Sequence, residues 1–167
     1  MKRRVLKTRQ LPSDITWHFQ GQIQGRKIRS IVSWADVVHS LDSLDHAQRF
    51  DSKISDKTLK FFVQVNVEPH RINRGGVPIS KLSQFLENLT TVSRIAPIGL
   101  MVVAPQGSPA IDAFNQVKEA KDQLIRTFPN LCALSMGMSS DFEAAIVTGA
   151  THLRIGSSIL GSRTLTA

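Results

Sequence analysis

The chain has little of what would mark a secreted or membrane protein. One cysteine, Cys132, occurs among 167 residues, so no internal disulfide is possible and a reducing compartment is indicated. No apolar run approaches the roughly 20 residues that a membrane-spanning helix needs. The basic start at 1–7 lacks the apolar stretch of a secretory signal. We therefore expect a cytoplasmic protein with no membrane partner, and a buried structural thiol at Cys132.

Tyrosine is absent and acidic residues are few. The 13 Asp and Glu residues stand against 21 Lys and Arg, which gives a formal net charge of +8. Basic residues crowd the first ten positions: Lys2, Arg3, Arg4, Lys7 and Arg9. A basic surface can bind nucleic acid, but no basic run here is interleaved with aromatic residues that would stack on bases. We predict a solvated basic helix over residues 1–12, and a nucleic-acid-binding remnant stays an alternative.

Short apolar segments alternate with amphipathic ones along the whole chain. The periodicity predicts strands over 16–20, 37–41, 59–67, 98–103, 131–138 and 152–155. It predicts helices over 26–33, 44–54, 82–89, 111–125 and 141–148, with Ser80 as an N-cap and Gly149 as a C-terminal stop. This alternation is typical of a parallel α/β fold. The length and the 41% hydrophobic content suit one globular domain over 1–167.

Two turns rich in glycine and serine are the most informative local patterns. The segments 134–145 and 151–161 each contain a short strand, a Gly/Ser turn and a helix start. Ser139 or Ser140 can cap the first helix, and Ser157 can open the second. Unpaired backbone N–H groups at two adjacent helix starts favour a phosphate, and in a (β/α) barrel the loops after the last two strands form the usual phosphate site. These turns therefore predict an anion site.

The same segments, LSMGMSSDFEAAI and THLRIGSSILG, resemble the closing part of the pyridoxal phosphate (PLP) homeostasis protein family, the YggS/PROSC-like proteins. Further blocks follow in the family's order at 17–24, 38–42, 63–66, 74–77 and 99–101. The resemblance covers nearly the whole chain from Thr16 onward. It implies an α/β fold, a (β/α) TIM-type barrel of the alanine-racemase-like PLP type. It also implies a non-catalytic, intracellular PLP-binding protein.

The number of strands falls short of a complete barrel. A closed (β/α) barrel has eight strands in typically about 250 residues, whereas the pattern here accounts for six. The resemblance implies that the first two β/α units are missing and that residues 1–12 are the remnant of a helix. A closed barrel has no sheet edges. The loss of two β/α units would therefore expose edges at 16–20 and 152–155. We expect self-association through these open edges.

The resemblance assigns PLP-binding roles to seven residues: Ser135, Met136, Arg154, Gly156, Ser157, His18 and Asn66. It implies that the hydroxyl at 135, the backbone N–H at 136 and the Gly-Ser pair at 156–157 meet the phosphate. It also implies that the arginine at 154 faces the pyridine nitrogen, where a permanent positive charge disfavours ring protonation. The alternatives are a salt bridge inside the barrel for Arg154 and a satisfied core histidine for His18.

The lysine that would bind the cofactor covalently is missing from the pattern. The resemblance implies an imine between PLP and a lysine at the end of the first strand, which this chain lacks. Lys60 starts its strand, at the wrong end for a barrel site. Lys27 follows a loop at the correct end and is the one candidate substitute. We therefore expect impaired imine formation. A racemase- or decarboxylase-like PLP enzyme remains an alternative, but it needs a catalytic lysine and a second acid/base group.

Two other catalytic arrangements are excluded by spacing. His39, Ser40 and Asp42 could suggest a Ser/His/Asp triad, but they occupy one strand and its turn. Neighbouring side chains on a strand alternate between faces and cannot converge. The scattered histidines also lack the spacing of a metal site. We therefore expect no metal and no catalytic residue.

Overall fold

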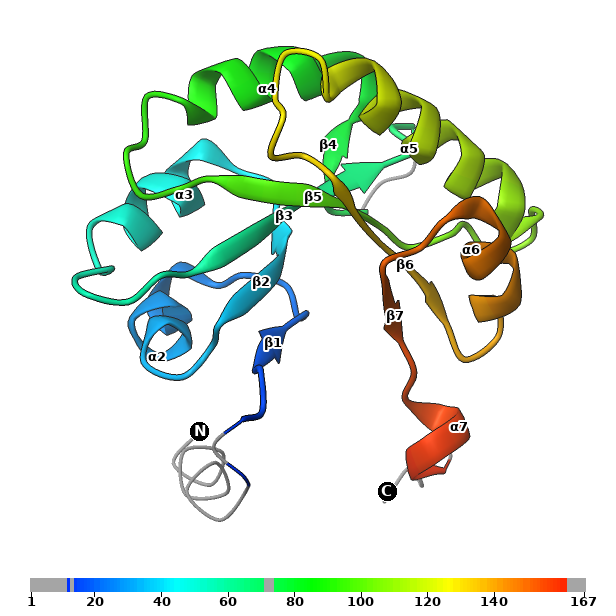
Figure 1. Cartoon of the computed structure of the whole chain (residues 1–167), viewed down its shortest axis with the longest axis horizontal. Helices are drawn as coiled ribbons and strands as arrows, with labels where there is room; N and C mark the ends of the chain where they lie inside the picture. The colour runs from blue at the N-terminus through cyan, green and yellow to red at the C-terminus, as the bar shows by residue number, and fades with distance from the viewer. Residues whose placement is uncertain (1–11, 13, 71–73, 162–167) are drawn as a thin grey trace.

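Parallel strands form one curled sheet with helices on its convex side (Figure 1). The computed structural model describes residues 12, 14–70 and 74–161, so the predicted helix at 1–12 lies outside the described residues apart from Pro12. The strand order is β1-β2-β3-β5-β6-β7, and every neighbouring pair is parallel. The bounds are His18–Phe19 (β1), Val37–Leu41 (β2), Lys60–Asn66 (β3), Pro97–Val102 (β5), Ala133–Met138 (β6) and His152–Arg154 (β7). This architecture confirms the prediction of an incomplete (β/α) barrel.

Helices follow the strands, and all but the short last one cover the convex face of the sheet. They are α2 (Ile28–Val32), α3 (Leu44–Asp51), α4 (Leu82–Leu89), α5 (Ala110–Leu124), α6 (Phe142–Thr148) and α7 (Ser157–Leu160), with 3-10 turns η1 (Gly25–Lys27) and η2 (Ile79–Lys81). The apolar stripes of α2 to α6 pack on the sheet in the main core, which includes Phe50, Phe61, Leu86, Leu100 and Phe114. A second, smaller core lies on the other face of the sheet, with Val37, Phe62, Met101 and Ala133. Central strands are therefore buried on both faces, as their near-continuous apolar runs predict.

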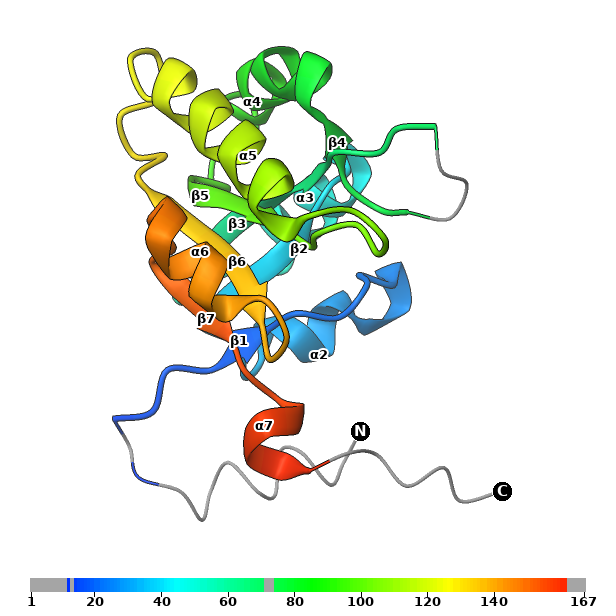
Figure 2. The same cartoon turned by 90° about the vertical axis from the view of Figure 1, so that its right-hand side faces the viewer.

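The loops after the strands gather on one side of the sheet. Figure 2 shows the described parts of the loop after β3 and the loop before α5 on the same side of the sheet. The loop after β3 ends in a two-residue strand, β4 (Val77–Pro78), which pairs in parallel with β3 and was not predicted. Parallel strands end at a common edge, so the polar residues of these loops are brought together there.

Two local predictions were wrong and one was confirmed. Ser80 does not cap α4, because it lies inside η2 and the helix begins at Leu82. Cys132 is exposed, because β6 begins one residue later and the thiol is left in the preceding loop. Gly149 ends α6 in a left-handed conformation with φ of 98°, which a glycine adopts without steric cost.

Strands β1 and β7 are the two ends of the strand order, as predicted for open edges. In Figure 1 they face each other across the concave side of the sheet. The rings of His18 and His152 bring them together, with centroids 5.8 Å apart. Within the described residues, no helix combines the length and apolar character needed to cross a membrane.

Candidate functional site

A chain of hydrogen bonds crosses the concave face from β1 to β7. His18 Nδ1 lies 2.7 Å from His39 Nε2, and His39 Nδ1 lies 2.7 Å from Ser135 Oγ. Arg154 Nη1 donates to the same hydroxyl at 3.0 Å, and its Nη2 donates to the carbonyl of Val102 at 2.8 Å. The four polar side chains come from four strands, so they meet only because the sheet curls.

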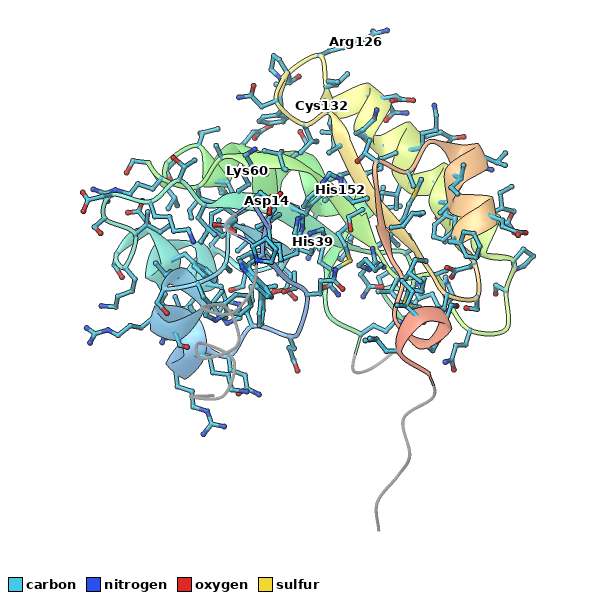
Figure 3. All side chains as sticks on the ribbon, turned by 60° about the horizontal axis from the view of Figure 1, so that its bottom comes forward. Asp14, His39, Lys60, Arg126, Cys132 and His152 are labelled. Atoms are coloured by element: carbon cyan, nitrogen blue, oxygen red, sulfur yellow. The ribbon has the colours of Figure 1, made fainter. Side chains whose placement is uncertain are left out.

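Strand periodicity and register explain why these side chains meet. Ser135 pairs with Met101 on one side and with His152 on the other, so the three side chains share the inner face. Arg154 lies two residues after His152 and points to the same face. His39 stacks on Phe62, with ring centroids 4.5 Å apart and planes 18° apart. Figure 3 shows His39 and His152 close together at the centre of this face.

Burial keeps the imidazoles of this face neutral. Desolvation, followed by the electrostatic effects of His18, His152 and Arg154, lowers the pKa of His39 to about 3. Burial also lowers the pKa of His18, against the nearby carboxylate of Asp36, which raises it. The pKa of His152 is lowered by burial, then by His18 and Lys60. Near neutral pH the guanidinium of Arg154 is thus the permanent positive charge of the face.

The two Gly/Ser turns are joined by one serine. Ser139 Oγ accepts hydrogen bonds from the backbone N–H of Gly156 at 3.2 Å and of Ser158 at 3.4 Å. The space beside Gly156 is open, since a Cβ built there would meet no atom within 4 Å. Ser139 and Ser140 do not cap α6 as predicted, because Asp141 is the N-cap residue. Ser139 therefore connects the loop after β6 to the start of α7.

The structure brings some of the predicted site residues together and separates others. Ser135, Arg154 and His18 belong to the hydrogen-bond chain, and Gly156 and Ser157 follow two and three residues after Arg154. Met136 is fully buried in the main core, within strand β6.

Asn66 is bound to the loop that follows its strand. Its Nδ2 donates to the carbonyl of Arg74 at 3.3 Å, and its Oδ1 accepts from the N–H of Glu68 at 2.8 Å. It lines a hollow of about 290 Å³ with Gln64, Arg74 and Val103 at the C-terminal end of β3. Asn66 therefore shapes the loop side of the sheet.

The residues of the excluded triad do not converge, and Lys60 and Lys27 lie at the predicted places in the fold. Ser40 Oγ donates to the carbonyl of Gly21, and Asp42 accepts from the N–H of Gly76, so neither meets His39. Lys60 is the first residue of β3, and Lys27 ends the η1 turn. Among the described residues, no group of three or more His, Cys, Asp or Glu side chains is arranged to hold a metal ion.

Sequence reasoning missed two residues of this site. The sequence suggests His39 only as a member of a triad, because its partner Ser135 lies 96 positions away. It suggests Ser139 only as a helix cap. The small, polar composition of the turn after β6 was the one sequence signal for it.

Comparisons with known proteins agree with this geometry. Residues 6–164 match the alanine racemase N-terminal domain family. A pyridoxal phosphate homeostasis protein of Corynebacterium glutamicum is 35% identical, over 95% of this chain and 75% of its own length. One from Mycobacterium leprae is 32% identical, over 92% of this chain and 64% of its own length. The chain belongs to the pyridoxal phosphate homeostasis protein family.

Solved structures also show similarity over most of the chain. PipY of Synechococcus elongatus, solved without PLP, superposes with a TM-score of 0.86 at 33% identity, over 96% of this chain and 78% of PipY. The PipY structure with PLP bound gives a TM-score of 0.85 at 32% identity, over 96% of this chain and 76% of PipY. A lysine/ornithine decarboxylase of Vibrio vulnificus, at 16% identity, a TM-score of 0.69, and 93% and 47% coverage, shares the fold alone. The chain spans about two thirds to three quarters of the length of its curated relatives.

Proposed function

We propose that this chain binds PLP non-covalently as a protein of intracellular PLP homeostasis, in the cytoplasm, with no turnover of its own. The observation that carries the proposal is the position of Arg154, held on the concave face two residues before the open space at Gly156. A fixed cation beside an unobstructed backbone suits a ligand that carries both an anionic group and a hydrogen-bond acceptor. PLP has both, as a phosphate and a ring nitrogen.

The residues divide between the two ends of the ligand. We assign the phosphate to the turns at Gly156, Ser157 and Ser139, with the backbone of Met136, because N–H groups and small side chains admit an anion. We assign the ring nitrogen to Arg154. We place Ser135 behind Arg154 instead of at the phosphate, where the resemblance puts it, because its hydroxyl already pairs with Arg154 and His39. His18 and Asn66 would line the two flanks. When bound, PLP supplies a reactive aldehyde, and the residues of this chain hold and orient it.

The fit is incomplete on the aldehyde side. A covalent bond requires a lysine amine whose pKa is lowered and which reaches the aldehyde. Lys60 lies at the opposite end of β3 from the loops, and Lys27 lies in a partly exposed turn after β1. We therefore propose reversible binding without a bond to lysine. The alternative of a racemase- or decarboxylase-like enzyme is supported only by the similarity of fold to the decarboxylase structure.

Calorimetric titration of PLP into Gly156→Val tests the site. A Cβ at Gly156 meets no protein atom and φ there is −128°, so the variant should fold normally while its side chain fills the ligand's space. We expect PLP binding to fall at least tenfold, because a charged hydrogen-bonded contact contributes about 1.5–3 kcal/mol. Cys132→Val is the matched control, since Cys132 is exposed at the opposite end of β6.

The two variants together decide the proposal. Loss of binding in Gly156→Val and normal binding in Cys132→Val would support it. Equal affinity in both variants would place any PLP site elsewhere on the chain, and no binding by the unaltered chain would refute the proposal.

A further inference from the structure

Arg154 fixes the direction of the hydrogen-bond chain on the concave face. A guanidinium only donates, so Ser135 Oγ must accept from Arg154 Nη1. The hydroxyl proton of Ser135 then needs an acceptor, and His39 Nδ1 lies 2.7 Å away. Since Ser135 is fully buried, a hydroxyl proton aimed elsewhere would lose its partner. His39 therefore accepts at Nδ1 and carries its proton on Nε2.

The hydrogen-bond chain continues from His39 to His18 on the edge strand β1. His39 Nε2–H donates to His18 Nδ1 at 2.7 Å, which leaves the proton of His18 on its own Nε2. Both imidazoles are then neutral, in agreement with burial that lowers the pKa of each. Protonation of His39 at Nδ1 would put a second donor against Ser135 and leave the hydroxyl proton unpaired. A neutral His39 is thus required for this arrangement of Arg154.

We propose that His39 is a positioning residue for the ligand's ring nitrogen, acting through Ser135 on Arg154. The inference rests on the proposed PLP site and adds a specificity role to it. Ser135 and the carbonyl of Val102 hold two amino groups of the guanidinium, which fixes the direction of its remaining N–H donors. A guanidinium aimed in this way selects a ring with an unprotonated acceptor nitrogen. His39, 1% exposed and stacked on Phe62, makes the arrangement rigid.

Two substitutions separate the roles of the two ring nitrogens of His39, Nδ1 toward Ser135 and Nε2 toward His18. In His39→Asn, the amide oxygen can take the place of Nδ1 and still accept from Ser135, while the contact with His18 is lost. In His39→Gln, the amide reaches the place of Nε2 and keeps the contact with His18, while Ser135 loses its acceptor. Ser135→Ala removes the link to Arg154 altogether. The inference predicts that Asn preserves the function of His39, whereas Gln and the Ser135 variant do not.

The experiment compares two probes, PLP and 1-deazapyridoxal 5′-phosphate, whose ring has C–H in place of nitrogen. The unaltered chain and His39→Asn should prefer PLP by about tenfold or more, the effect of one charged hydrogen bond. His39→Gln and Ser135→Ala should lose this preference and bind both probes about equally. A purely structural role for His39 would weaken both probes in parallel.

Spectra of the ligand-free chain test the hydrogen bonds directly. With ¹⁵N-labelled histidine, His39 and His18 should both show the tautomer protonated at Nε2. Protonation of His39 at Nδ1, or an unchanged preference for PLP in His39→Gln, would overturn the inference. Equal binding of both probes by the unaltered chain would overturn it and leave phosphate binding standing. No binding of either probe would refute the proposed function itself.

Discussion

The three histidines of the concave face have pKa values below that of free histidine, and this has a measurable effect on stability. The pKa of His39 is about 3 in the folded chain and 6.5 when unfolded. Between these values the unfolded chain binds a proton that the folded chain does not. Stability should therefore fall as the pH drops from 6.5 towards 3, with a slope from His39 of up to about 1.4 kcal/mol per pH unit.

Urea unfolding at a series of pH values checks this prediction. His39→Asn removes the titrating group and should flatten the slope. His70→Asn, which removes an exposed imidazole in the loop after β3, is the control and should leave the slope unchanged. A profile for the unaltered chain that is flat down to pH 4 would contradict the predicted burial of a neutral His39.

Single residues show where sequence reasoning ends. Arg154, Gly156 and Ser157 could be nominated from the sequence, because local motifs carry the resemblance to the family, and their roles toward PLP stay predictions. The partners of Ser135 could not, since contact with His39 depends on strand order and on the curl of the sheet. The exposure of Cys132 also could not be predicted, because it depends on a strand boundary that falls two residues later than the apolar run indicates.

At the scale of elements, the turns after β6 and β7 depend on Ser139. Its hydroxyl pairs two N–H groups, those of Gly156 and Ser158. Ser139→Ala should leave both N–H groups without this acceptor. We expect their amide hydrogen exchange to quicken about fivefold, as the loss of roughly 1 kcal/mol per hydrogen bond implies.

Exchange measured by NMR on the ligand-free chain tests this role. Ser140→Ala is the control, because the neighbouring side chain is exposed and makes no contact of this kind. Equal exchange at both amides in the two variants would show that Ser139 does not hold the turns together.

Most elements could be predicted because their periodicity is strong. The run at 59–67 became β3 and the stripe after Ser80 became α4, each within two residues of its predicted ends. The two-residue strand β4 could not be predicted, since it has no periodicity and depends on pairing with β3. Ser80 failed as a cap because the chain enters α4 through a 3-10 turn.

At the scale of the whole molecule, exposed apolar side chains gather near one edge of the sheet. Large exposed aliphatic residues lie on α6 and α7, which flank β7: Ile146, Val147, Ile159 and Leu160, at 54%, 81%, 74% and 85% exposure. Strand β7 itself is an end of the strand order, with backbone groups available for pairing. Apolar surface beside an open edge favours association.

We therefore expect the chain to self-associate, with a sedimentation coefficient that rises with concentration. Val147→Lys combined with Leu160→Lys should reduce association, because two charges replace the most exposed apolar groups. Ile111→Lys, on the exposed side of α5, is the control and should not. A monomer at every concentration would show that the edges are protected within one chain.

The central claim is that this part of a barrel holds PLP without a covalent bond. Native mass spectrometry of the chain with PLP, followed by borohydride reduction and denaturation, tests it in one measurement. The account predicts a one-to-one complex under native conditions and an unmodified chain mass after reduction and denaturation. The absence of any complex, or a stoichiometric adduct that survives denaturation and maps to Lys27, would contradict it.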